Sequence, residues 1–394
     1  MKFDKSMWNE YAFSDVIDFQ EGPGLLAKDF REHGVPLIRL SGMEDNVSLL
    51  NGCNYIEEEL VNKKYPHFRL KEGDILLSTS ATLGKTALVE MEAVGAIAYT
   101  GLIRMRPKSE IIYAPFIKYL LQSPSFNRQI ETMGVGSVMK HFGPTHLKRI
   151  NVIIPPVDFQ KVTSKLLSDL EPLMEFIEAE QRNLKLLWQT LLNNFVSNKP
   201  QFGNLLSGSR LHQYKFSEVA HKVNRRTDPV VDGIKRRIGG ENLISGDLKI
   251  RTWGVVGKDY VGPAFTFHVL PGDILYVSRN AHLRKVAFAD FEGVCSNTTF
   301  IIQSSGDKVE QSLLKHVMLS EEFTKYTVAM SKGSTNPYIN WKDLDNFTFK
   351  VPDLTLQKKM ATFLDEILSA IEISKERTNQ IKALKDKLLM ELLG

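Results

Sequence analysis

The sequence predicts an α+β protein with two tandem α/β modules, each followed by a long helix, and an antiparallel coiled coil formed by these two helices. Three observations carry this prediction. Residues 118–192 align without a gap on residues 315–389. Each copy begins with short β-type runs and then changes to a helical period. Both helical segments place apolar residues at alternating three- and four-residue steps, which is the coiled-coil pattern.

The repeat extends over most of the chain. Upstream of the gapless stretch, Gly73-Asp74-Ile75-Leu76 matches Gly272-Asp273-Ile274-Leu275, and Phe13-Ser14-Asp15-Val16 matches Phe216-Ser217-Glu218-Val219. Identical pairs within the gapless stretch include Lys118/Lys315, Phe126/Phe323, Gly136/Gly333, Ser137/Ser334, Leu147/Leu344, Pro155/Pro352, Gln160/Gln357 and Lys161/Lys358. A chain built twice from one module has two equivalent surfaces, so we expect it to read or bridge something with two parts.

Composition is that of an ordinary globular protein. The 394 residues are 43% apolar and 24% charged, so each half can bury its own core. The formal net charge of +4 permits binding to nucleic acid without requiring it. Cys53 and Cys295 show no metal-ligand spacing, and two thiols in so long a chain suit a reducing compartment.

The sequence gives no sign of a membrane partner. Residues 1–10 lack the apolar segment of a signal peptide, and the longest apolar run, residues 94–103, is too short to span a bilayer. We therefore expect a cytoplasmic protein.

The front part of each repeat, residues 1–155 and 201–352, is predicted to form a compact α/β module. Short β-type runs at residues 74–78, 273–277 and 299–302 are separated by turn residues. One helix is expected in each module, at about residues 114–134 and 310–331.

The back parts, residues 156–200 and 353–394, are predicted to be the spacer helices. Asp158 and Thr355 stand where an N-cap acceptor is expected, and Pro172 should kink or restart the first helix. The same periodicity also fits a plain structural bundle, but each helix follows a globular module, which favours a spacer. The predicted helix–helix seam consists of Leu170, Leu173, Ile177, Leu184, Leu187 and Leu191 in the first helix and Ile367, Ile371, Ile381, Leu384 and Leu388 in the second.

One short stretch partly matches a catalytic pattern. Leu83-Gly84-Lys85-Thr86 resembles the end of a phosphate-binding loop, but Thr79 stands where that loop needs glycine. The histidines show no metal-ligand spacing and no nucleophile elbow is present. We expect no catalytic residue, no metal and no cofactor in this chain. A nuclease or nucleotidase that uses Lys85 and Thr86 is the enzyme alternative.

Polar and basic residues instead gather in loops at equivalent places of the two copies. Such side chains pair with base edges or phosphates, although a solvated loop explains each residue taken singly. The candidate DNA-binding residues are Ser78, Thr79, Ser80, Thr82, Lys85, Ser137, Lys140 and His141 in the first copy, and Ser278, Arg279, Asn280, His282, Arg284, Lys285, Ser334 and Asn336 in the second, with a basic run at Arg225, Arg226, Arg236 and Arg237.

The doubled order of motifs resembles the specificity subunit of type I restriction–modification enzymes. The markers are a Gly-Asp-Ile-Leu strand, a Gly-Ser turn, a leucine, one or two prolines and a glutamine before a long leucine-spaced helix. They stand at Gly73–Leu76, Gly136-Ser137, Leu147, Pro155-Pro156 and Gln160, and again at Gly272–Leu275, Gly333-Ser334, Leu344, Pro352 and Gln357. The chain departs from the family pattern at Phe159, Leu356 and Asp353, which affects how each helix begins.

The resemblance implies two target-recognition domains, each reading one half of a bipartite, asymmetric site in double-stranded DNA. It implies that the helices set the spacer and dock two methyltransferase subunits, with a restriction and motor subunit completing the complex. S-adenosylmethionine, ATP and Mg²⁺ are then expected on those partners. A helix of about 24–30 residues spans roughly 35–45 Å, or about 10–13 base pairs of B-form DNA.

An alternative stays open on the sequence alone: a non-catalytic adaptor whose two modules hold proteins and whose coiled coil is a spacer. It predicts that function survives alanine substitution of Arg279, Arg284 and Lys285.

Overall fold

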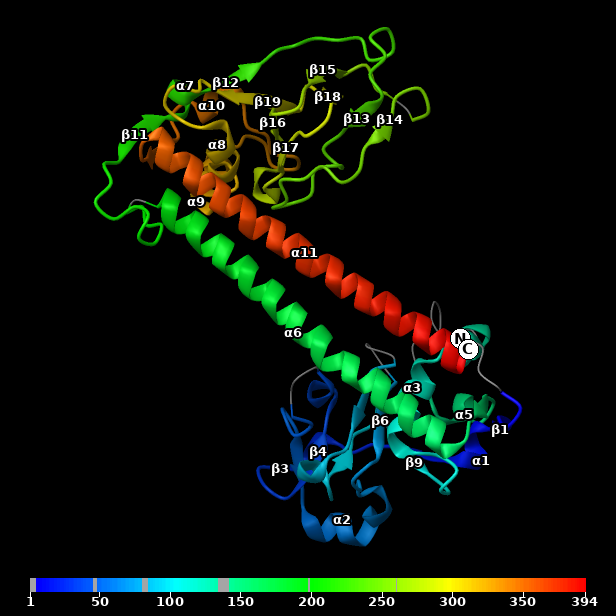
Figure 1. The fold of residues 1–394 in the computed structure, drawn as a ribbon. Helices are drawn as coiled ribbons and strands as arrows, with labels where there is room; N and C mark the ends of the chain where they lie inside the picture. Colours follow the sequence, from blue (N-terminus) through cyan, green and yellow to red (C-terminus); the bar gives the residue numbers. More distant parts are fainter. Residues whose placement is uncertain (1–4, 45–47, 80–83, 134–141, 198, 260) are drawn as a thin grey trace. The chain divides into compact units, whose positions relative to one another are not determined.

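The protein is described by a computed structural model that covers residues 5–44, 48–79, 84–133, 142–197, 199–259 and 261–394. The chain forms two compact units. Unit 1 comprises Met1–Ile177 and Arg377–Gly394, and unit 2 comprises Glu178–Glu376. Each unit combines an α/β module with parts of two 40-residue helices, α6 (Val157–Val196) and α11 (Leu354–Leu393) (Figure 1).

The module of unit 1 contains two four-stranded sheets and a two-stranded ribbon, with orders β2-β9-β6-β7, β3-β5-β4-β8 and β1-β10. The pair β4·β8 is parallel, and the other pairs are antiparallel. Its elements are β1 (Asn9–Ala12), α1 (Phe13–Val16), β2 (Ile17–Glu21), β3 (Phe30–Arg31), β4 (Val35–Ile38), β5 (Asn54–Ile56), α2 (Glu58–Lys64), β6 (Ile75–Ser78), β7 (Thr86–Leu88), β8 (Ile97–Ala98), β9 (Leu102–Pro107), α3 (Ala114–Gln122), α4 (Pro124–Thr132), α5 (Pro144–Leu147) and β10 (Asn151–Ile154).

The module of unit 2 repeats this plan, with sheets β12-β19-β16-β17 and β14-β13-β18-β15 and the ribbon β11-β20. Here β13·β18 is the parallel pair. The predicted duplicated α/β fold is therefore confirmed. The elements are β11 (His212–Lys215), α7 (Phe216–Val219), β12 (Ala220–Val223), β13 (Arg236–Ile238), β14 (Gly254–Val255), β15 (Phe265–Val269), β16 (Ile274–Val277), β17 (Val286–Phe288), β18 (Gly293–Ser296), β19 (Thr299–Ser304), α8 (Gln311–Val317), α9 (Glu321–Met330), α10 (Trp341–Leu344) and β20 (Thr348–Val351).

The prediction of a single helix at about residues 114–134 and at about 310–331 is wrong, because each of these segments forms two helices. Ser123 separates α3 from α4, and residues 318–320 separate α8 from α9. The Oγ atoms of Ser123 and Ser320 accept hydrogen bonds from the backbone N–H groups of Phe126 and Phe323, both at 3.2 Å. These serines are thus N-caps of a second helix, which lets the chain turn sharply while its first N–H groups remain bonded.

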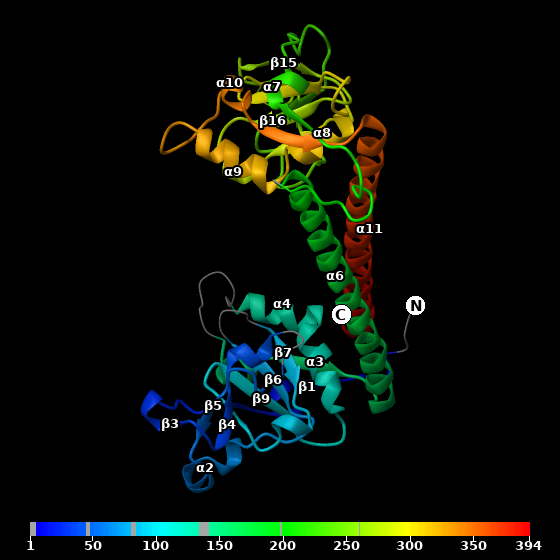
Figure 2. The ribbon, with the colours of Figure 1, turned by 90° about the vertical axis from the view of Figure 1, so that its left-hand side faces the viewer.

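The two long helices pack against each other in opposite directions within each unit, as predicted (Figures 1 and 2). In unit 1, Leu167 shares a buried cluster with Leu389 and Leu392, and Lys385 Nζ lies 3.4 Å from the Glu171 carboxylate. In unit 2, Trp188 and Leu192 of α6 share a buried cluster with Leu364 and Ile367 of α11.

The buried stripe of the helices differs from the predicted seam. Ile177 and Ile367 are buried, but Leu173, Leu187 and Leu384 are nearly half exposed. Trp188, adjacent to Leu187, is only 4% exposed, and its ring lies 6.3 Å from that of His316 on α8. The module packs against the helix pair as a third element, so the buried stripe is wider than a two-helix seam and rotated from it.

The helix starts also differ from expectation. Asp158 and Thr355 lie inside the first turns of α6 and α11, two positions too late to be N-caps. In the second copy the cap is Asp353, whose Oδ1 accepts a hydrogen bond from Leu356 N at 3.0 Å. Helix α6 runs through Pro172 without restarting, and both Leu167 before the proline and Ile177 after it are buried.

A buried glutamine fixes the start of α6 to its module. Gln160 is fully buried. Its Oε1 accepts a hydrogen bond from Tyr113 N at 2.8 Å, and its Nε2 donates to Ile111 O at 2.7 Å and to Pro155 O at 2.8 Å. All three partners are backbone atoms, and two of them belong to the loop that precedes α3.

The second copy repeats this arrangement at α11. Gln357 is also fully buried. Its Oε1 accepts from Glu310 N at 2.9 Å, and its Nε2 donates to Lys308 O at 2.9 Å and to Pro352 O at 2.8 Å. The motif glutamine is therefore a structural clamp between module and helix, and its position in both copies explains its place in the sequence repeat.

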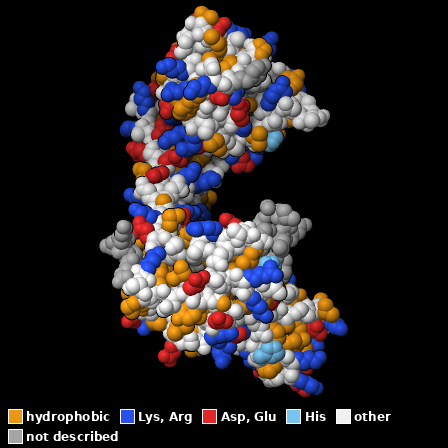
Figure 3. Space-filling model, turned by 90° about the vertical axis from the view of Figure 1, so that its right-hand side faces the viewer, with side chains coloured by type: hydrophobic (Ala, Val, Ile, Leu, Met, Phe, Trp, Pro, Cys, Tyr) orange, Lys and Arg blue, Asp and Glu red, His pale blue; other side chains and the backbone are white. Residues whose placement is uncertain are grey.

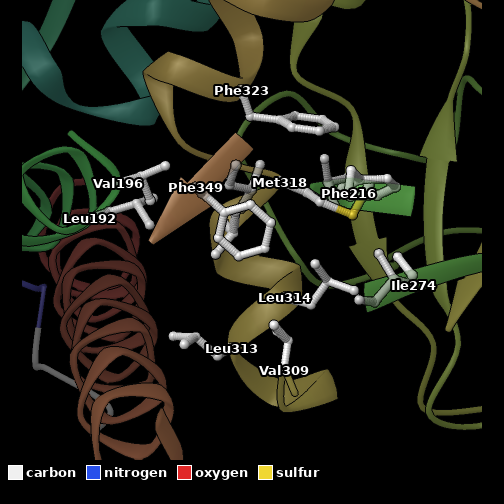
Figure 4. Close-up of a cluster of buried hydrophobic side chains, with 14 of the residues drawn as sticks. Leu192, Val196, Phe216, Ile274, Val309, Leu313, Leu314, Met318, Phe323 and Phe349 are labelled. Atoms are coloured by element: carbon white, nitrogen blue, oxygen red, sulfur yellow. The ribbon is translucent and has the colours of Figure 1, made fainter. Parts of the chain in front are cut away.

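The core of unit 2 forms where the module meets the helices. Leu192 and Val196 of α6 share a buried cluster with Leu313 and Leu314 of α8 and with Val309, which lies just before α8 (Figure 4). Phe216, Phe323 and Phe349 continue this cluster into the module. Burial of such a continuous apolar cluster makes the module and the adjoining helix segments one cooperative body.

Replacing Gln357 by leucine should lower the free energy of unfolding of unit 2 by about 2–4 kcal/mol, because one N–H and two carbonyl groups lose their partners in a buried place. In a Trp8→Phe background the three remaining tryptophans all lie in unit 2, so urea denaturation followed by fluorescence reports on that unit. Asp353→Ala is the control and should cost about 1 kcal/mol through loss of the cap. Equal stability of the two variants would contradict the clamp.

A second contact between module and long helix, at Asp365, predicts that the stability of unit 2 depends on pH. Asp365 of α11 accepts from Lys315 Nζ at 2.8 Å and contacts His316 Nε2 at 2.9 Å. Burial lowers the pKa of His316, whereas the hydrogen bonds from His316 and Lys315 outweigh burial and lower the pKa of Asp365.

The unfolded state therefore takes up a proton at residue 316 before the folded state does, and stability should fall as pH drops below about 6.5. The measurement is urea denaturation of the wild type, His316→Asn and His221→Asn between pH 7.5 and 5.5. His316→Asn should be less stable overall and should lose part of the pH dependence, whereas the variant of the exposed His221 should keep it. An unchanged slope in His316→Asn would refute the assignment.

Candidate nucleic-acid interface

Three loops of unit 2 meet beyond the end of β16. Val277 N donates to Lys285 O at 3.1 Å, which closes the loop that follows β16. Ser278 N donates to Thr298 O at 2.9 Å, and Ile339 N donates to Ser278 O at 2.9 Å. The frame of the site is thus made by backbone hydrogen bonds that do not depend on side-chain identity.

The Gly-Ser turn of the second copy is part of this group of loops. Lys332 N donates to Tyr338 O at 2.8 Å and Tyr338 N donates to Lys332 O at 2.9 Å, so residues 332–338 form a closed loop. Gly333 has φ = +90°, a conformation that favours glycine. The positive φ of this turn explains why the sequence repeat has a glycine at this position.

Two predicted site residues that are far apart in the sequence come together between these loops. Asn280 N donates to Pro337 O at 2.7 Å, and Asn280 Nδ2 donates to Asn336 Oδ1 at 3.1 Å. Asn280 has φ = +53°, which asparagine adopts more readily than most residues. The loops after β16 and after α9 therefore form one polar surface.

Several predicted residues remain exposed on this surface. Arg279, His282, Ser334 and Asn336 are exposed, and within the part of the chain that the structure describes Arg279 makes no ion pair. Tyr338 is also exposed, beside Arg279 in an isolated backbone bridge. Sequence reasoning missed Tyr338, and an aromatic residue two positions after Asn336 was the available signal. We define Arg279, Asn280, His282, Ser334, Asn336 and Tyr338 as the loop surface of unit 2.

Other predicted residues are occupied in building the loops. Arg284 donates to Leu319 O, and burial lowers the pKa of its guanidinium. Lys285 Nζ donates to Gly240 O at 2.6 Å, and the buried Ser278 donates its Oγ hydrogen to Thr298 O at 2.8 Å. These three side chains support the loops rather than project from them.

The predicted basic run lies over aromatic rings. The Arg236 guanidinium is 4.8 Å from the Trp253 ring and 4.5 Å from the Phe291 ring. Arg226 lies 3.8 Å from the Phe267 ring and donates to Thr266 Oγ1 at 2.7 Å. Sequence reasoning missed these rings, including the partly exposed Trp253, because they come from loops and strands distant in sequence.

The remaining two arginines of the run are paired with carboxylates. Arg225 donates to Asp273, the buried aspartate of the Gly-Asp-Ile-Leu motif, and Arg237 lies 2.8 Å from Glu241. Asp273 also accepts from Leu270 N at 2.8 Å and from Gln303 Nε2 at 2.9 Å. The motif aspartate thus holds the turn before β16, and Arg225 balances its buried charge.

Unit 1 contains the same loop frame. Ser78 N donates to Lys85 O at 2.9 Å, Thr79 N donates to Gly101 O at 2.9 Å, and Phe142 N lies 3.5 Å from Thr79 O. These bonds match those of Val277, Ser278 and Ile339 one for one. Of the residues predicted here, Ser80, Thr82, Ser137, Lys140 and His141 lie outside the described residues. The two ends of the loops nevertheless meet as they do in unit 2.

Charge is mixed over the surface, and the face in Figure 3 shows Lys and Arg interspersed with Asp and Glu on both units. Within the described ranges, no three His, Cys, Asp or Glu residues gather as a metal site. No helix among the described residues has the length and apolar character needed to cross a membrane.

The long helices expose apolar side chains away from the buried stripe. In unit 1, α6 exposes Val162, Leu166, Leu173 and Phe176. Their spacing of four, seven and three residues places them on one face of the helix. We call these four residues the outer stripe of α6. An exposed apolar row of this kind is typical of a surface that another protein covers.

Known proteins resemble this chain along its whole length. The family model of the type I restriction modification DNA specificity domain matches residues 5–186 and 261–383. The putative type I restriction enzyme MjaX specificity subunit of Methanocaldococcus jannaschii is 22% identical over 404 residues, covering 98% of this chain and 92% of the relative. The MjaVIII specificity subunit of the same organism is 25% identical over 202 residues, which is 50% of this chain and 47% of the length of that relative.

Solved structures agree on the fold. The crystal structure of the type I restriction–modification system S subunit from M. genitalium superposes with a TM-score of 0.60 at 12% identity, covering all of this chain and 98% of the other. A chain from a structure of a type I restriction–modification system gives 0.59 at 16% identity, covering 99% and 98%. The resemblance inferred from the doubled motifs is therefore confirmed, and this chain belongs to the family of type I restriction–modification DNA specificity subunits, the components that do not carry catalysis.

Proposed function

We propose that this chain is the DNA-recognition subunit of a type I restriction–modification complex and that each repeat reads one half of a bipartite, asymmetric site in double-stranded DNA. The observation that carries the proposal is the loop frame. Equivalent backbone hydrogen bonds, from Val277, Ser278 and Ile339 and from Ser78, Thr79 and Phe142, join loops of unrelated side-chain chemistry in the two units. One frame with two sets of side chains suits two readers of different base sequences.

The loop surface of unit 2 is suited to contact DNA. Arg279 is exposed and carries a guanidinium that can donate two hydrogen bonds to guanine, and Asn336 is suited to adenine. Tyr338 adds an exposed ring beside them. The arginines stacked on aromatic rings, Arg226 and Arg236, have fixed orientations and are proposed to contact phosphates.

The long helices are proposed to set the unspecified spacer and to dock two methyltransferase subunits. Support comes from their 40-residue length and from the outer stripe of α6, Val162, Leu166, Leu173 and Phe176. Catalysis, S-adenosylmethionine, ATP and Mg²⁺ are assigned to the partner subunits, with a restriction and motor subunit completing the assembly. We propose that the whole complex is cytoplasmic.

Selection from a pool of random duplexes by the chain with its methyltransferase should enrich one split, asymmetric motif. Replacing both Arg279 and Asn336 by alanine should relax the half of the motif read by unit 2 and weaken binding about 5- to 150-fold for each base that the variant no longer reads. The other half should stay unchanged. Lys215→Ala, an exposed basic residue of β11, is the control and should retain the whole motif.

The result that would remove this proposal is DNA binding with no enriched split motif, or a double variant that selects the same motif as the wild type. Retained methyltransferase binding without any DNA selection would favour the protein-binding adaptor. Hydrolysis of nucleotide or DNA by the purified chain, lost in Lys85→Ala, would favour the enzyme alternative.

Substitution of Leu173 and Phe176 by glutamate should weaken methyltransferase binding at least about tenfold without unfolding the chain, because both side chains are already exposed. Size-exclusion chromatography and titration calorimetry with the methyltransferase subunit measure the effect. Lys165→Ala, also exposed on α6, is the matched control. Full-strength assembly by the double glutamate variant would show that the partner docks elsewhere.

A further inference from the structure

A cavity of about 680 Å³ lies at the edge of the β2-β9-β6-β7 sheet in unit 1. Its walls come from β2, from β9, and from the 3₁₀ turn Pro66–Phe68 with the residues just after it. None of these residues belongs to the loops described above. The polar and charged lining consists of Asp18, His67, Arg69, Lys71, Arg104 and Arg106, with Gln20 beside them.

Arg104 lines this cavity and is only 4% exposed. Its Nη2 donates to Asp18 Oδ2 at 2.7 Å and lies 3.3 Å from Gln20 Oε1. Its Nε and Nη1 are buried and have no hydrogen-bond partner among the described residues. A buried guanidinium is costly unless its donors are satisfied, so two unused donors need an explanation.

The second repeat shows that the fold does not need an arginine here. In unit 1, Arg104 pairs with Leu76 on one side and Gln20 on the other. In unit 2, the matching strand position is Ile301, which pairs with Leu275 and Val223. Ile301 is fully buried in an apolar cluster. Arginine at this position is therefore specific to the first copy, and the duplicated fold does not require it.

The other cations of the cavity differ in how far they are neutralised. Arg106 makes two hydrogen bonds of 2.6 Å to the buried Asp74. Arg69 Nη2 lies 3.3 Å from Glu58. Lys71 makes no ion pair with another described residue, and Arg104 has only Asp18, whose side chain is 50% exposed. Positive charge thus remains in the cavity, where Arg104 is balanced by one half-exposed carboxylate and Lys71 by none that the structure describes.

We propose that this cavity binds a phosphate group, with Arg104 as its principal donor and Lys71 and Arg69 at its mouth. The planar fork of a guanidinium matches the oxygens of phosphate, and a charge-assisted pair with a largely buried guanidinium is stronger than one with an exposed side chain. Asp18 is the carboxylate that pairs with Arg104 in this structure. Because its side chain is half exposed, it can rotate toward solvent when an oxyanion takes its place.

The phosphate can belong to a DNA backbone or to a free anion, and the chemistry of the cavity is the same for both. The site does not rest on the proposed function, because binding of an inorganic anion is measured without DNA or partner subunits. Failure of either proposal therefore leaves the other standing.

The experiment titrates the full chain with inorganic phosphate and with pyrophosphate at constant ionic strength, using calorimetry and thermal unfolding, with chloride as the reference anion. The wild type should show saturable binding. Asp18→Asn should bind at least about fivefold more tightly, because a competing negative charge near the anion is removed. Arg104→Ile, which copies the second repeat, should abolish binding, and Arg104→Lys should bind more weakly than the wild type.

Two results would overturn the proposal: no saturable binding in either the wild type or Asp18→Asn, or binding by Arg104→Ile equal to that of the wild type. Circular dichroism of Arg104→Ile checks that the variant is folded, and the tighter binding expected of Asp18→Asn is a second readout that does not depend on that variant.

Competition with random-sequence duplex DNA shows whether the bound phosphate belongs to a DNA backbone or to a free anion. The DNA backbone is the ligand if DNA displaces bound pyrophosphate and if the salt dependence of DNA binding falls by about one phosphate contact in Arg104→Ile. Independent binding of the two assigns a free anion.

Discussion

The clamp made by Gln160 and Gln357 is the interaction on which the rest of the structure depends. Each glutamine uses both ends of its amide on backbone atoms of the loop before α3 or α8 and of the proline that precedes the long helix. Full burial makes any loss of these bonds expensive. Because the same bonds occur in both copies, each module joins its helix with the same local geometry.

The loops combine a backbone frame that is the same in both units with side chains that differ between the two copies. Main-chain hydrogen bonds from the end of β6 and β16 hold the frame, while Arg279, Asn336 and their neighbours project from it. Side chains such as Lys285 and Ser278, which look equally suitable for DNA in the sequence, are instead bonded to carbonyl groups beneath the loops. Residue type therefore selected loops that meet in the structure but could not separate supporting side chains from projecting ones.

Much of the architecture could be predicted because the chain repeats itself. The duplicated motifs located both modules and both long helices, and the helical period together with the placement of each helix after a module predicted that the helices pair. Local detail was less accessible. Ser123 and Ser320 break helices through capping bonds that a periodic pattern does not show, and Trp188 rather than Leu187 is buried because a module packs against the helix pair. Arg104 could not be singled out at all, since its burial arises from strand pairing and has no sequence signature.

Because main-chain atoms form the loop frame, outward side chains on the loops can be substituted without loss of the frame. Val277, Ser278 and Ile339 hold the loops with atoms that every residue other than proline possesses. A point mutation at an outward position such as Arg279 or Ser334 leaves those atoms in place and costs the fold little. Under the proposed function, new sequence preferences can therefore arise one residue at a time in one half of the molecule while the other half keeps its own.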